Sequence, residues 1–540
     1  MNTVLKIIYK FGTSGYRNNT DAGFNQAVVE QITHAIADVL IEQMTTDWQQ
    51  VRPVLLGGDT RQKTKEAIPV IKAVLQARGL DVYHIEGDVP TPVLAFAAAY
   101  LKDLTGCETP AAGAILMTAS HNPWDYGGYN FLTPEGAVAP SSLSELFEAR
   151  QATPSNAVLN REALGASATP FKRALQPYQA YFKHLKNRVG LSSAVFEAQP
   201  LQVFYDPLYA TGRHYFPKLM EDFGVLTTSI HDDDNRPAGY TGEPEPSAEN
   251  LVELSELVKQ SGATNPMTVG FSNDGDSDRF GVLDETGTYL QPNFVLLLVL
   301  FWLGQKPSTL ETDAVVVRSQ ATTHAVDELA ASFGLPVLQT PVGYKYIAET
   351  FIEHDEEEAL APVIFGGESS GGLSIGGHIP EKDGLLANLI IADLVASQKK
   401  PLSQVLSGII AGLENTYHFA EWTIKTTEKD PILAQAQAFF AEGGMMGKAC
   451  CVVDVEKTQH SASTLKNKFG TQDGIKLYLT SGSWVLVRAS GTEPIVRLYL
   501  EAVGETPEAC ETAFENLSSF WLQVMTEKAG VTADKIVRKF

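Results

Sequence analysis

Cysteine is scarce in this chain, with four among 540 residues, at positions 107, 450, 451 and 510. No two of them are spaced as a Cys-x-x-Cys pair, and four are too few for a disulfide framework in a chain of this length. The cysteine content therefore indicates a reduced compartment, and we expect a cytoplasmic protein.

Basic residues are also in short supply, because 41 lysines and arginines face 64 aspartates and glutamates, for a formal net charge of -23. Proteins that bind nucleic acid need a basic face that replaces counterions, and docking on anionic lipid needs a similar surface. We therefore expect neither nucleic acid nor membrane as a partner. A small anionic ligand remains compatible, provided that arginine and lysine gather locally around it.

Long hydrophobic runs are missing as well. The most apolar stretch, at 294–303, has about half of the ~20 residues that span a bilayer, so it predicts a buried helix. The N-terminal sequence MNTVLKIIYKFG lacks the apolar core and the small-residue cleavage site of a signal peptide.

What the chain does contain is an alternation of short apolar runs with segments of helical periodicity, such as AIPVIKAVLQARG and TTHAVDELAASFG. This alternation is typical of βαβ units and mostly parallel sheets, and the length favours about three to five domains. The stretch 138–175 is rich in alanine, serine, threonine and proline, and we expect a surface excursion there. Strands are predicted at 51–56, 114–117, 201–205, 267–271, 314–317, 362–365 and 484–487.

Most of the predicted strands end in a loop loaded with polar residues or glycine. Ligands of open α/β sheets bind beyond the carboxyl ends of strands, so these loops are the candidate functional segments. The loops are GGDTR (57–61), TASHNP (118–123), DPLYATG (206–212), NDGDSDR (273–279), RSQATTH (318–324), FGGESSGG (365–372) and RASGTEP (488–494).

Three alternating carboxylates, Asp274, Asp276 and Asp278, dominate one of these loops. Carboxylates this close repel one another unless a cation lies among them, and hard oxygen ligands favour Mg²⁺ or Ca²⁺. An EF-hand loop is one alternative, with Glu285 at position twelve, but Arg279 stands where the sharp turn requires glycine, and the segment follows a strand. A solvated acidic turn is the other alternative.

Two further loops carry phosphate- and sugar-binding chemistry. Arg488 and Arg497 can make charge-assisted contacts to phosphate, although a β-turn with an incidental arginine has the same pattern. Glu368 lies between glycines and hydroxyls that could bind sugar hydroxyls, and the nearby segment HIPEKDG supplies His378 and Lys382. Ser120 can be read either as a working hydroxyl or as an ordinary turn residue.

Taken in order, the motifs TASHNP, DGDSDR, GGESSGG and RASGTEP resemble those of the α-D-phosphohexomutase family, the phosphoglucomutases and phosphomannomutases. The resemblance runs from FGTSGYR at 11–17 to the strand IVRLYLEA at 495–502. It implies an α/β fold of four domains around a central cleft: three related α/β domains with mixed or parallel sheets, then a smaller C-terminal α+β domain. The bounds we expect are 1–190, 191–306, 307–412 and 413–540.

The resemblance also implies a role for each loop. Ser120 is the expected phosphoserine, surrounded by Arg17, His121 and Arg279, and its phosphoryl group shares Mg²⁺ with the three aspartates. The resemblance assigns substrate binding to Gly343, Lys345, Glu368, Ser370, Lys382, Arg488, Ser490, Gly491, Thr492 and Arg497.

The sequence departs from the family pattern at two places. Many members carry a lysine where Asn130 stands, and a neutral amide cannot transfer a proton, so His121, His378 or Lys382 is expected to do so. The sugar loop has Ser369 where a second glutamate is common, a change expected to tune binding.

These features predict a mutase that interconverts glucose 1-phosphate and glucose 6-phosphate, with glucose 1,6-bisphosphate as intermediate and activator and hexose phosphates as its ligands. HIPEKDG resembles phosphoglucomutases most. The alternatives are a phosphomannomutase or dual-specificity mutase, a non-catalytic regulatory protein that binds phosphosugars, a sugar-bisphosphate synthase or phosphatase, and a Ca²⁺-binding module. We expect a monomer or a homodimer.

Overall fold

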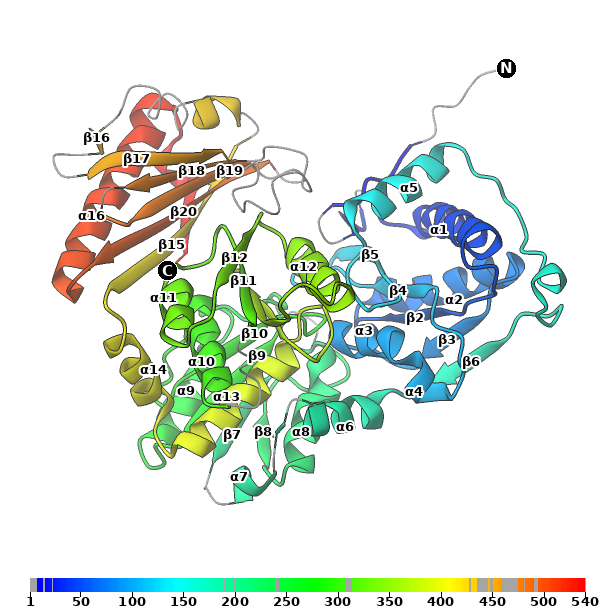
Figure 1. Ribbon diagram of the computed structural model, residues 1–540, viewed down its shortest axis with the longest axis horizontal. Coiled ribbons are helices and arrows are strands. Elements are labelled where there is room, and N and C mark those ends of the chain that lie inside the picture. The colour runs from blue at the N-terminus through cyan, green and yellow to red at the C-terminus, as the bar shows by residue number, and fades with distance from the viewer. Residues whose placement is uncertain are drawn as a thin grey trace. The chain divides into compact units, whose positions relative to one another are not determined.

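The strands of this chain form four sheets, which Figure 1 shows from one side of a computed structural model. Residues 1–295, 347–366 and 370–405 belong to one compact unit, and residues 296–346, 367–369 and 406–540 belong to a second. The structure describes residues 7–12, 15–21, 23–188, 190–191, 193–197, 201–237, 240, 242–306, 313–426, 429–434, 445–446, 450–457, 474–479, 481–489 and 494–539.

The first sheet has six strands in the order β1-β5-β4-β2-β3-β6. Its inner strands β4, β2 and β3 and the edge strand β6 run parallel, whereas β5 and β1 are antiparallel additions. Its elements are β1 (Tyr16–Asn19), α1 (Gln26–Thr46), β2 (Val54–Gly58), α2 (Gln62–Ala77), β3 (Val82–Ile85), α3 (Thr91–Ala99), α4 (Leu101–Thr105), β4 (Gly113–Met117), β5 (Tyr126–Leu132), α5 (Ser141–Ala152), η1 (Glu162–Leu164) and β6 (Lys172–Leu175).

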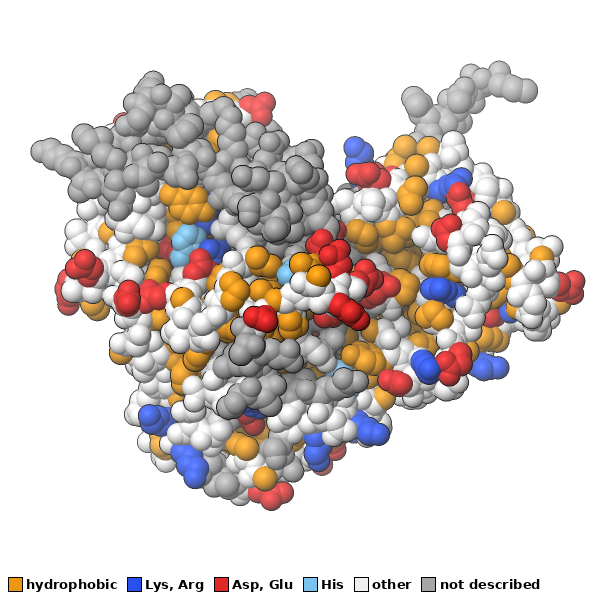
Figure 2. Space-filling view, viewed as in Figure 1, with side chains coloured by type: hydrophobic (Ala, Val, Ile, Leu, Met, Phe, Trp, Pro, Cys, Tyr) orange, Lys and Arg blue, Asp and Glu red, His pale blue; other side chains and the backbone are white. Residues whose placement is uncertain are grey.

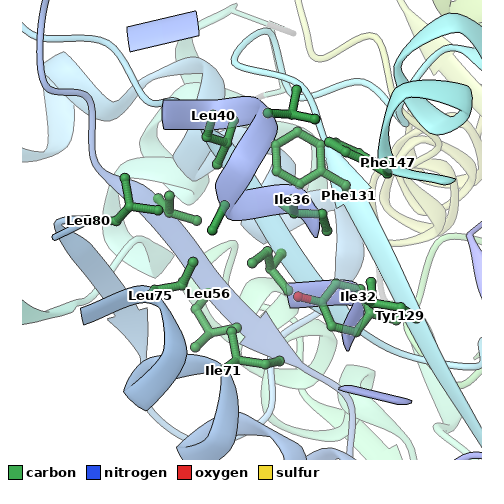
Figure 3. Packing of buried hydrophobic residues seen from close by; sticks show 14 of the residues in the cluster. Ile32, Ile36, Leu40, Leu56, Ile71, Leu75, Leu80, Tyr129, Phe131 and Phe147 are labelled. Atoms are coloured by element: carbon green, nitrogen blue, oxygen red, sulfur yellow. The ribbon is translucent and has the colours of Figure 1, made fainter. Parts of the chain in front are cut away.

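Helix α1 supplies much of the core on one face of this sheet. Ile32, Ile36 and Leu40 recur every four residues, so they share one side of the helix, and each is at most 1% exposed. Figure 3 shows them together with Phe131 of β5 and Phe147 of α5. The prediction of a surface excursion at 138–175 is therefore wrong in part, because α5 contributes to the core and β6 pairs with β3.

The second sheet is four-stranded, in the order β10-β9-β7-β8, with β7 parallel to both of its neighbours and β10 antiparallel to β9. The tight connection from β9 to β10 holds the three alternating aspartates. The elements are α6 (Tyr178–Arg188), α7 (Ser193–Glu197), β7 (Gln202–Asp206), η2 (Thr211–His214), α8 (Phe216–Asp222), β8 (Thr227–Ser229), α9 (Val252–Gly262), β9 (Thr268–Asn273) and β10 (Phe280–Leu283).

The third sheet is also four-stranded, in the order β12-β11-β13-β14. The apolar run at 294–303 forms most of α10 and is largely buried, as predicted. Among the described helices, none is long and apolar enough to cross a membrane. The elements are α10 (Pro292–Gly304), β11 (Val315–Ser319), α11 (Ala325–Ser332), β12 (Val337–Thr340), α12 (Tyr344–Glu356), β13 (Val363–Glu368), β14 (Gly372–Ile375), α13 (Gly384–Gln398) and α14 (Leu402–Ala411).

The last sheet has seven strands in the order β16-β17-β18-β19-β20-β15-β21, paired antiparallel, and α16 lies across one of its faces (Figure 1). Leu517 and Trp521 of α16 are buried against it. The elements are β15 (Thr416–Lys425), β16 (Met445–Met446), β17 (Cys450–Lys457), β18 (Gly474–Leu479), β19 (Trp484–Ala489), β20 (Ile495–Gly504), α16 (Pro507–Gln523), η3 (Val524–Lys528), η4 (Ala533–Lys535) and β21 (Ile536–Lys539).

These sheets confirm the predicted fold class, with α/β domains followed by a C-terminal α+β domain. Each of the predicted strands has an observed strand within a few residues of its predicted ends. The domain boundaries remain a prediction. The acidic composition is visible at the surface: Figure 2 shows acidic side chains gathered at the end of α12, where residues 355–358 are exposed.

Candidate active site

The loop after β4 holds Ser120 in an uncommon backbone conformation. Its φ is +49°, in the left-handed region that residues other than glycine seldom adopt and that often marks a functional site. The Ser120 amide donates to the Thr118 hydroxyl over 2.8 Å, and the residue is 1% exposed. The serine is thus fixed in a buried, strained turn, which is more than an ordinary polar loop requires.

The β9–β10 connection brings its three aspartates to this serine. Ligand oxygens of Asp274, Asp276 and Asp278 all lie within 4.8 Å of one another, and the three residues are buried. The Ser120 hydroxyl donates to Asp274 Oδ2 over 2.8 Å. A Cβ on Gly275 would lie 2.3 Å from the Ser120 carbonyl oxygen, so the close approach of the two loops requires glycine there.

Each aspartate of the triad is held by a different partner. The Thr91 hydroxyl donates to Asp276 Oδ2 over 2.6 Å, and the Arg279 amide donates to Asp274 Oδ1 over 3.1 Å. The Lys382 ammonium lies 2.5 Å from Asp278 Oδ2. These contacts come from three separate segments, so the tertiary fold defines the geometry of the triad.

The electrostatics of the triad are those of crowded carboxylates. Burial, together with the charges of the neighbouring aspartates, raises the pKa of Asp274 and of Asp276. Burial also opposes the charge of Asp278, but the Lys382 and Arg279 cations outweigh it and lower the pKa of that carboxyl. The triad therefore favours a bound cation, which would relieve the repulsion.

The triad also has unused oxygen atoms. Among the described residues, the buried Oδ1 atoms of Asp276 and Asp278 accept no hydrogen bond. Buried carboxylate oxygens without a donor are costly, and oxygen donors of this kind are the ligands that Mg²⁺ and Ca²⁺ prefer. The three aspartates and the adjacent serine hydroxyl thus fit a hard divalent cation, and the EF-hand alternative is wrong because the loop joins two strands.

Cationic and proton-carrying side chains surround the serine. Nδ1 of His121 lies 3.3 Å from the Ser120 hydroxyl oxygen, and Arg17 donates to the Asn122 side chain over 3.1 Å. The Nε of Arg17 is buried without a partner in the part of the chain that the structure describes, and burial lowers the pKa of this guanidinium. Arg279 Nε lies 3.9 Å from Asp278. This environment suits a phosphoryl group on the serine, because it offers positive charge and an unused donor.

His378 is bonded elsewhere on both ring nitrogens. Its Nε2 lies 2.8 Å from Asp383 Oδ2 and its Nδ1 lies 3.1 Å from Nε2 of His184. Asp383 also accepts from the Tyr181 hydroxyl and caps α13 through the Leu386 amide. These contacts make His378 part of a buried network behind Lys382, and its role in proton transfer stays a prediction. Asn130 lies in β5, buried.

The predicted sugar-binding residues lie at the ends of elements around the third sheet. Glu368 ends β13 and is 9% exposed, while Ser370 follows it in a half-buried turn. Gly343 has φ +128° and precedes α12, in whose first turn Lys345 lies. Their roles in substrate binding remain predictions.

The predicted phosphate pocket is described in part. Arg488 at the end of β19 is directly opposite Arg497 of β20, so two guanidinium groups start from neighbouring backbone positions. Arg497 also lies 3.4 Å from Glu421. Ser490, Gly491 and Thr492 lie outside the described residues.

Sequence reasoning assigned no role to three residues that support the site. Thr91 follows no recognisable signal, although it bonds Asp276 through both its hydroxyl and its amide. Burial raises the pKa of Glu381, beside Lys382, to about 7. Arg61 lies in the polar loop GGDTR, which drew attention by its position after a strand, and its guanidinium contacts the serine loop.

Comparison with known proteins agrees with this site. Four family models match in order: phosphoglucomutase/phosphomannomutase alpha/beta/alpha domain I at 9–156, domain II at 179–287, domain III at 291–413 and the C-terminal domain at 425–515. The chain is 27% identical to a phosphoglucomutase/phosphomannomutase of Thermococcus kodakarensis over 510 residues, which cover 92% of this chain and 95% of the relative.

A phosphoglucosamine mutase of Frankia casuarinae is 26% identical over 500 residues, which cover 91% of this chain and 94% of the relative. In fold, the chain is similar to the open form of parafusin, a phosphoglucomutase from Paramecium, with a TM-score of 0.79 and 18% identity over 98% of this chain and 97% of that one. The matched domains cover most of the sequence, and the chain belongs to the phosphoglucomutase/phosphomannomutase family of phosphohexomutases.

Proposed function

We propose that this enzyme interconverts glucose 1-phosphate and glucose 6-phosphate through phospho-Ser120 and a glucose 1,6-bisphosphate intermediate. The observation that carries the proposal is the buried Ser120 hydroxyl, held 2.8 Å from one carboxylate of a triad with unused oxygen atoms. A serine that served only as a turn residue would need neither the triad nor the strained backbone.

The reaction exchanges one phosphorus–oxygen ester bond for another. In the first half, the bond between phosphorus and Ser120 Oγ breaks as the free hydroxyl of a hexose monophosphate bonds to phosphorus, and that hydroxyl loses its proton. In the second half, the other phosphate of the bisphosphate returns to Ser120 Oγ. Phosphoryl transfer of this kind is catalysed by positioning and by neutralising charge.

The aspartates would hold Mg²⁺, which when bound neutralises phosphoryl oxygens and so lets a hydroxyl oxygen approach phosphorus. Arg17 and Arg279 supply positive charge for the oxygens that face away from the triad. His121 Nδ1, 3.3 Å from Ser120 Oγ, is placed to exchange a proton with that oxygen. Lys382 and His378 are the other candidates for proton transfer.

We further propose that the phosphate that is not being transferred binds Arg488, Arg497 and the segment between them. Planar guanidinium groups can each bond two phosphate oxygens, which fits a site that must accept the bisphosphate in both orientations. The sugar hydroxyls would then bind the loop at 365–372. This part of the proposal assigns binding to Gly343, Lys345, Glu368, Ser370, Lys382, Arg488, Ser490, Gly491, Thr492 and Arg497.

Glucose phosphates are the first choice of substrate because HIPEKDG, at 378–384, resembles phosphoglucomutases most. Mannose differs by one hydroxyl orientation, which one or two hydrogen bonds discriminate, so a dual-specificity mutase is the nearest variant. The similarity to a phosphoglucosamine mutase makes glucosamine phosphate the second candidate. A bisphosphate synthase or a binding protein would keep the same site without the same turnover.

The test compares the 1-phosphates of glucose, mannose and glucosamine, each with Mg²⁺ and a trace of the matching 1,6-bisphosphate. Phosphorus NMR follows the 6-phosphate and any bisphosphate that escapes. We expect glucose 1-phosphate to have a kcat/KM at least about tenfold above the others, no accumulation of bisphosphate, and loss of turnover in EDTA. A preference for glucosamine would replace the proposed substrate, and accumulating bisphosphate would replace the reaction.

A further inference from the structure

Arg61 is a buried arginine whose guanidinium group lies under the serine loop. The residue is 2% exposed and comes between the end of β2 and the first turn of α2. Its Nη2 donates to the carbonyl oxygens of Ser120 at 2.7 Å and Asn122 at 2.5 Å. Its Nη1 donates to the carbonyl oxygens of Pro123 at 2.5 Å and Tyr126 at 3.4 Å.

The remaining donor of the guanidinium group is anchored to the domain core. Nε donates to Asp59 Oδ2 over 3.0 Å, and both side chains of this pair are 1% exposed. Asp59 is itself fixed by the Thr64 hydroxyl and by its own amide, which donates to the Met117 carbonyl at the end of β4. Arginine has five N–H donors in a rigid plane, and here each nitrogen is used.

The four carbonyl groups come from residues 120, 122, 123 and 126, and they converge on one plane only if the loop curls around it. The curl is the same feature that carries Ser120 at φ +49°. Lysine has three donors on a point charge, so it cannot reproduce this set of contacts.

We propose that Arg61 is a positioning residue for the phosphoryl-accepting serine, holding the loop backbone so that Oγ of Ser120 faces Asp274. This inference rests on the proposed function in that it predicts an effect on turnover. Arg61 itself makes no contact with the reacting oxygen, since its bonds go to backbone carbonyl groups.

Arg78 provides a matched control in the same domain. It also forms a buried ion pair with an aspartate, Asp38, with side chains 4% and 1% exposed, and it also donates to backbone carbonyl oxygens, those of Ala157 and His34. None of these partners belongs to the serine loop. A loss caused only by disrupting a buried arginine would therefore appear in both variants.

The experiment compares Arg61→Lys with Arg78→Lys in the full chain. For Arg61→Lys we expect kcat to fall about a hundredfold, the effect of a misplaced reacting group, with KM for glucose 1-phosphate changed by less than about threefold. The amides of Asn122 and Tyr126, which are bonded within the loop, should exchange with solvent at least about tenfold faster. For Arg78→Lys we expect kcat within about twofold of the wild type and unchanged exchange in the loop.

Wild-type kcat and loop exchange in Arg61→Lys would overturn the inference, as would an equal loss of kcat in Arg78→Lys. If Arg61→Lys fails to fold, Asp59→Asn tests the same clamp by loosening its anchor, and there too faster loop exchange with lower kcat is expected. If the wild type turned over no hexose phosphate, the proposed function would fail, but loop exchange in the two arginine variants would still decide what Arg61 holds.

Discussion

Two clusters of buried charge differ in how they are balanced: the aspartate triad of the first unit, and a group around Lys476 in the second. Lys476 is fully buried, donates to the Gln320 carbonyl over 2.8 Å and lies 3.9 Å from the centre of the Trp484 ring. The buried Glu501 accepts from the Trp484 indole over 2.6 Å and from the His324 amide over 2.9 Å.

Both clusters lie beside a polar loop that follows a strand, and in the sequence the two loops look alike. In the Lys476 cluster, a buried cation and a buried carboxylate neutralise each other within the chain. In the triad, three carboxylates crowd together, and oxygens on two of them accept no hydrogen bond from the described residues. The comparison teaches that a functional loop is recognised by charge and hydrogen-bonding capacity left over after folding, because a structural cluster has used its own.

The largest effect should come from removing the reacting group of the triad site. Ser120→Ala deletes the oxygen that carries the phosphoryl group, so kcat/KM should fall by about four orders of magnitude or more. The melting temperature should change little, since alanine fits the space that serine leaves. Steady-state kinetics and thermal unfolding measure both, with Ser397→Ala, on α13, as the control. Near-normal turnover in Ser120→Ala would contradict the serine mechanism.

The next effect concerns the balanced cluster. Lys476→Met leaves the Glu501 carboxylate buried without its cation, which should lower the free energy of unfolding of the second unit by about 3–5 kcal/mol. Under folding conditions kcat should stay within about threefold of the wild type. Urea unfolding followed by tryptophan fluorescence measures the loss, and Lys400→Met, at an exposed lysine, is the control.

Adding Glu501→Gln to Lys476→Met should restore part of the stability, because the neutral amide no longer needs a cation. An unstable double variant with no recovery would show that the ammonium acts through packing against Trp484 and not through charge.

The smallest effect should come from the metal response of the triad. Mg²⁺ binds only the folded site, so a concentration a hundredfold above its dissociation constant should stabilise the wild type by about 2.7 kcal/mol. Asp276→Asn removes one repelling charge, so it should melt at or above the wild-type temperature in EDTA and gain almost nothing from Mg²⁺. Thermal unfolding with and without Mg²⁺ measures this, with Glu66→Gln as the control.

A wild-type melting temperature that ignores Mg²⁺ would show that the unused oxygens of the triad are satisfied in another way. An equal Mg²⁺ response in Asp276→Asn would instead place the cation elsewhere in the chain. Either result would remove the contrast between the triad and the Lys476 cluster.

Much of the fold could be predicted from the sequence, because buried strands are continuous apolar runs. The run predicted at 267–271 is β9 at Thr268–Asn273, and the run at 294–303 lies in α10. The stretch 138–175 was misjudged because α5 buries little besides Phe147 and Gln151, and β6 is exposed at three of its four residues. Weak periodicity of this kind is a poor signal, and pairing with β3 decides the structure there.

By itself, the sequence determined which side chains could do chemistry: an alternating run of aspartates repels itself whatever the surrounding fold, and a serine between a strand and an Asn-Pro turn is always near a strand end. Only the tertiary structure decided that these two loops meet, that Lys382 and Thr91 hold the triad, and that His378 is bonded to His184 and Asp383. The acceptors of Arg61 are backbone carbonyl groups. Every residue has one, so no pattern of side chains could have revealed that contact.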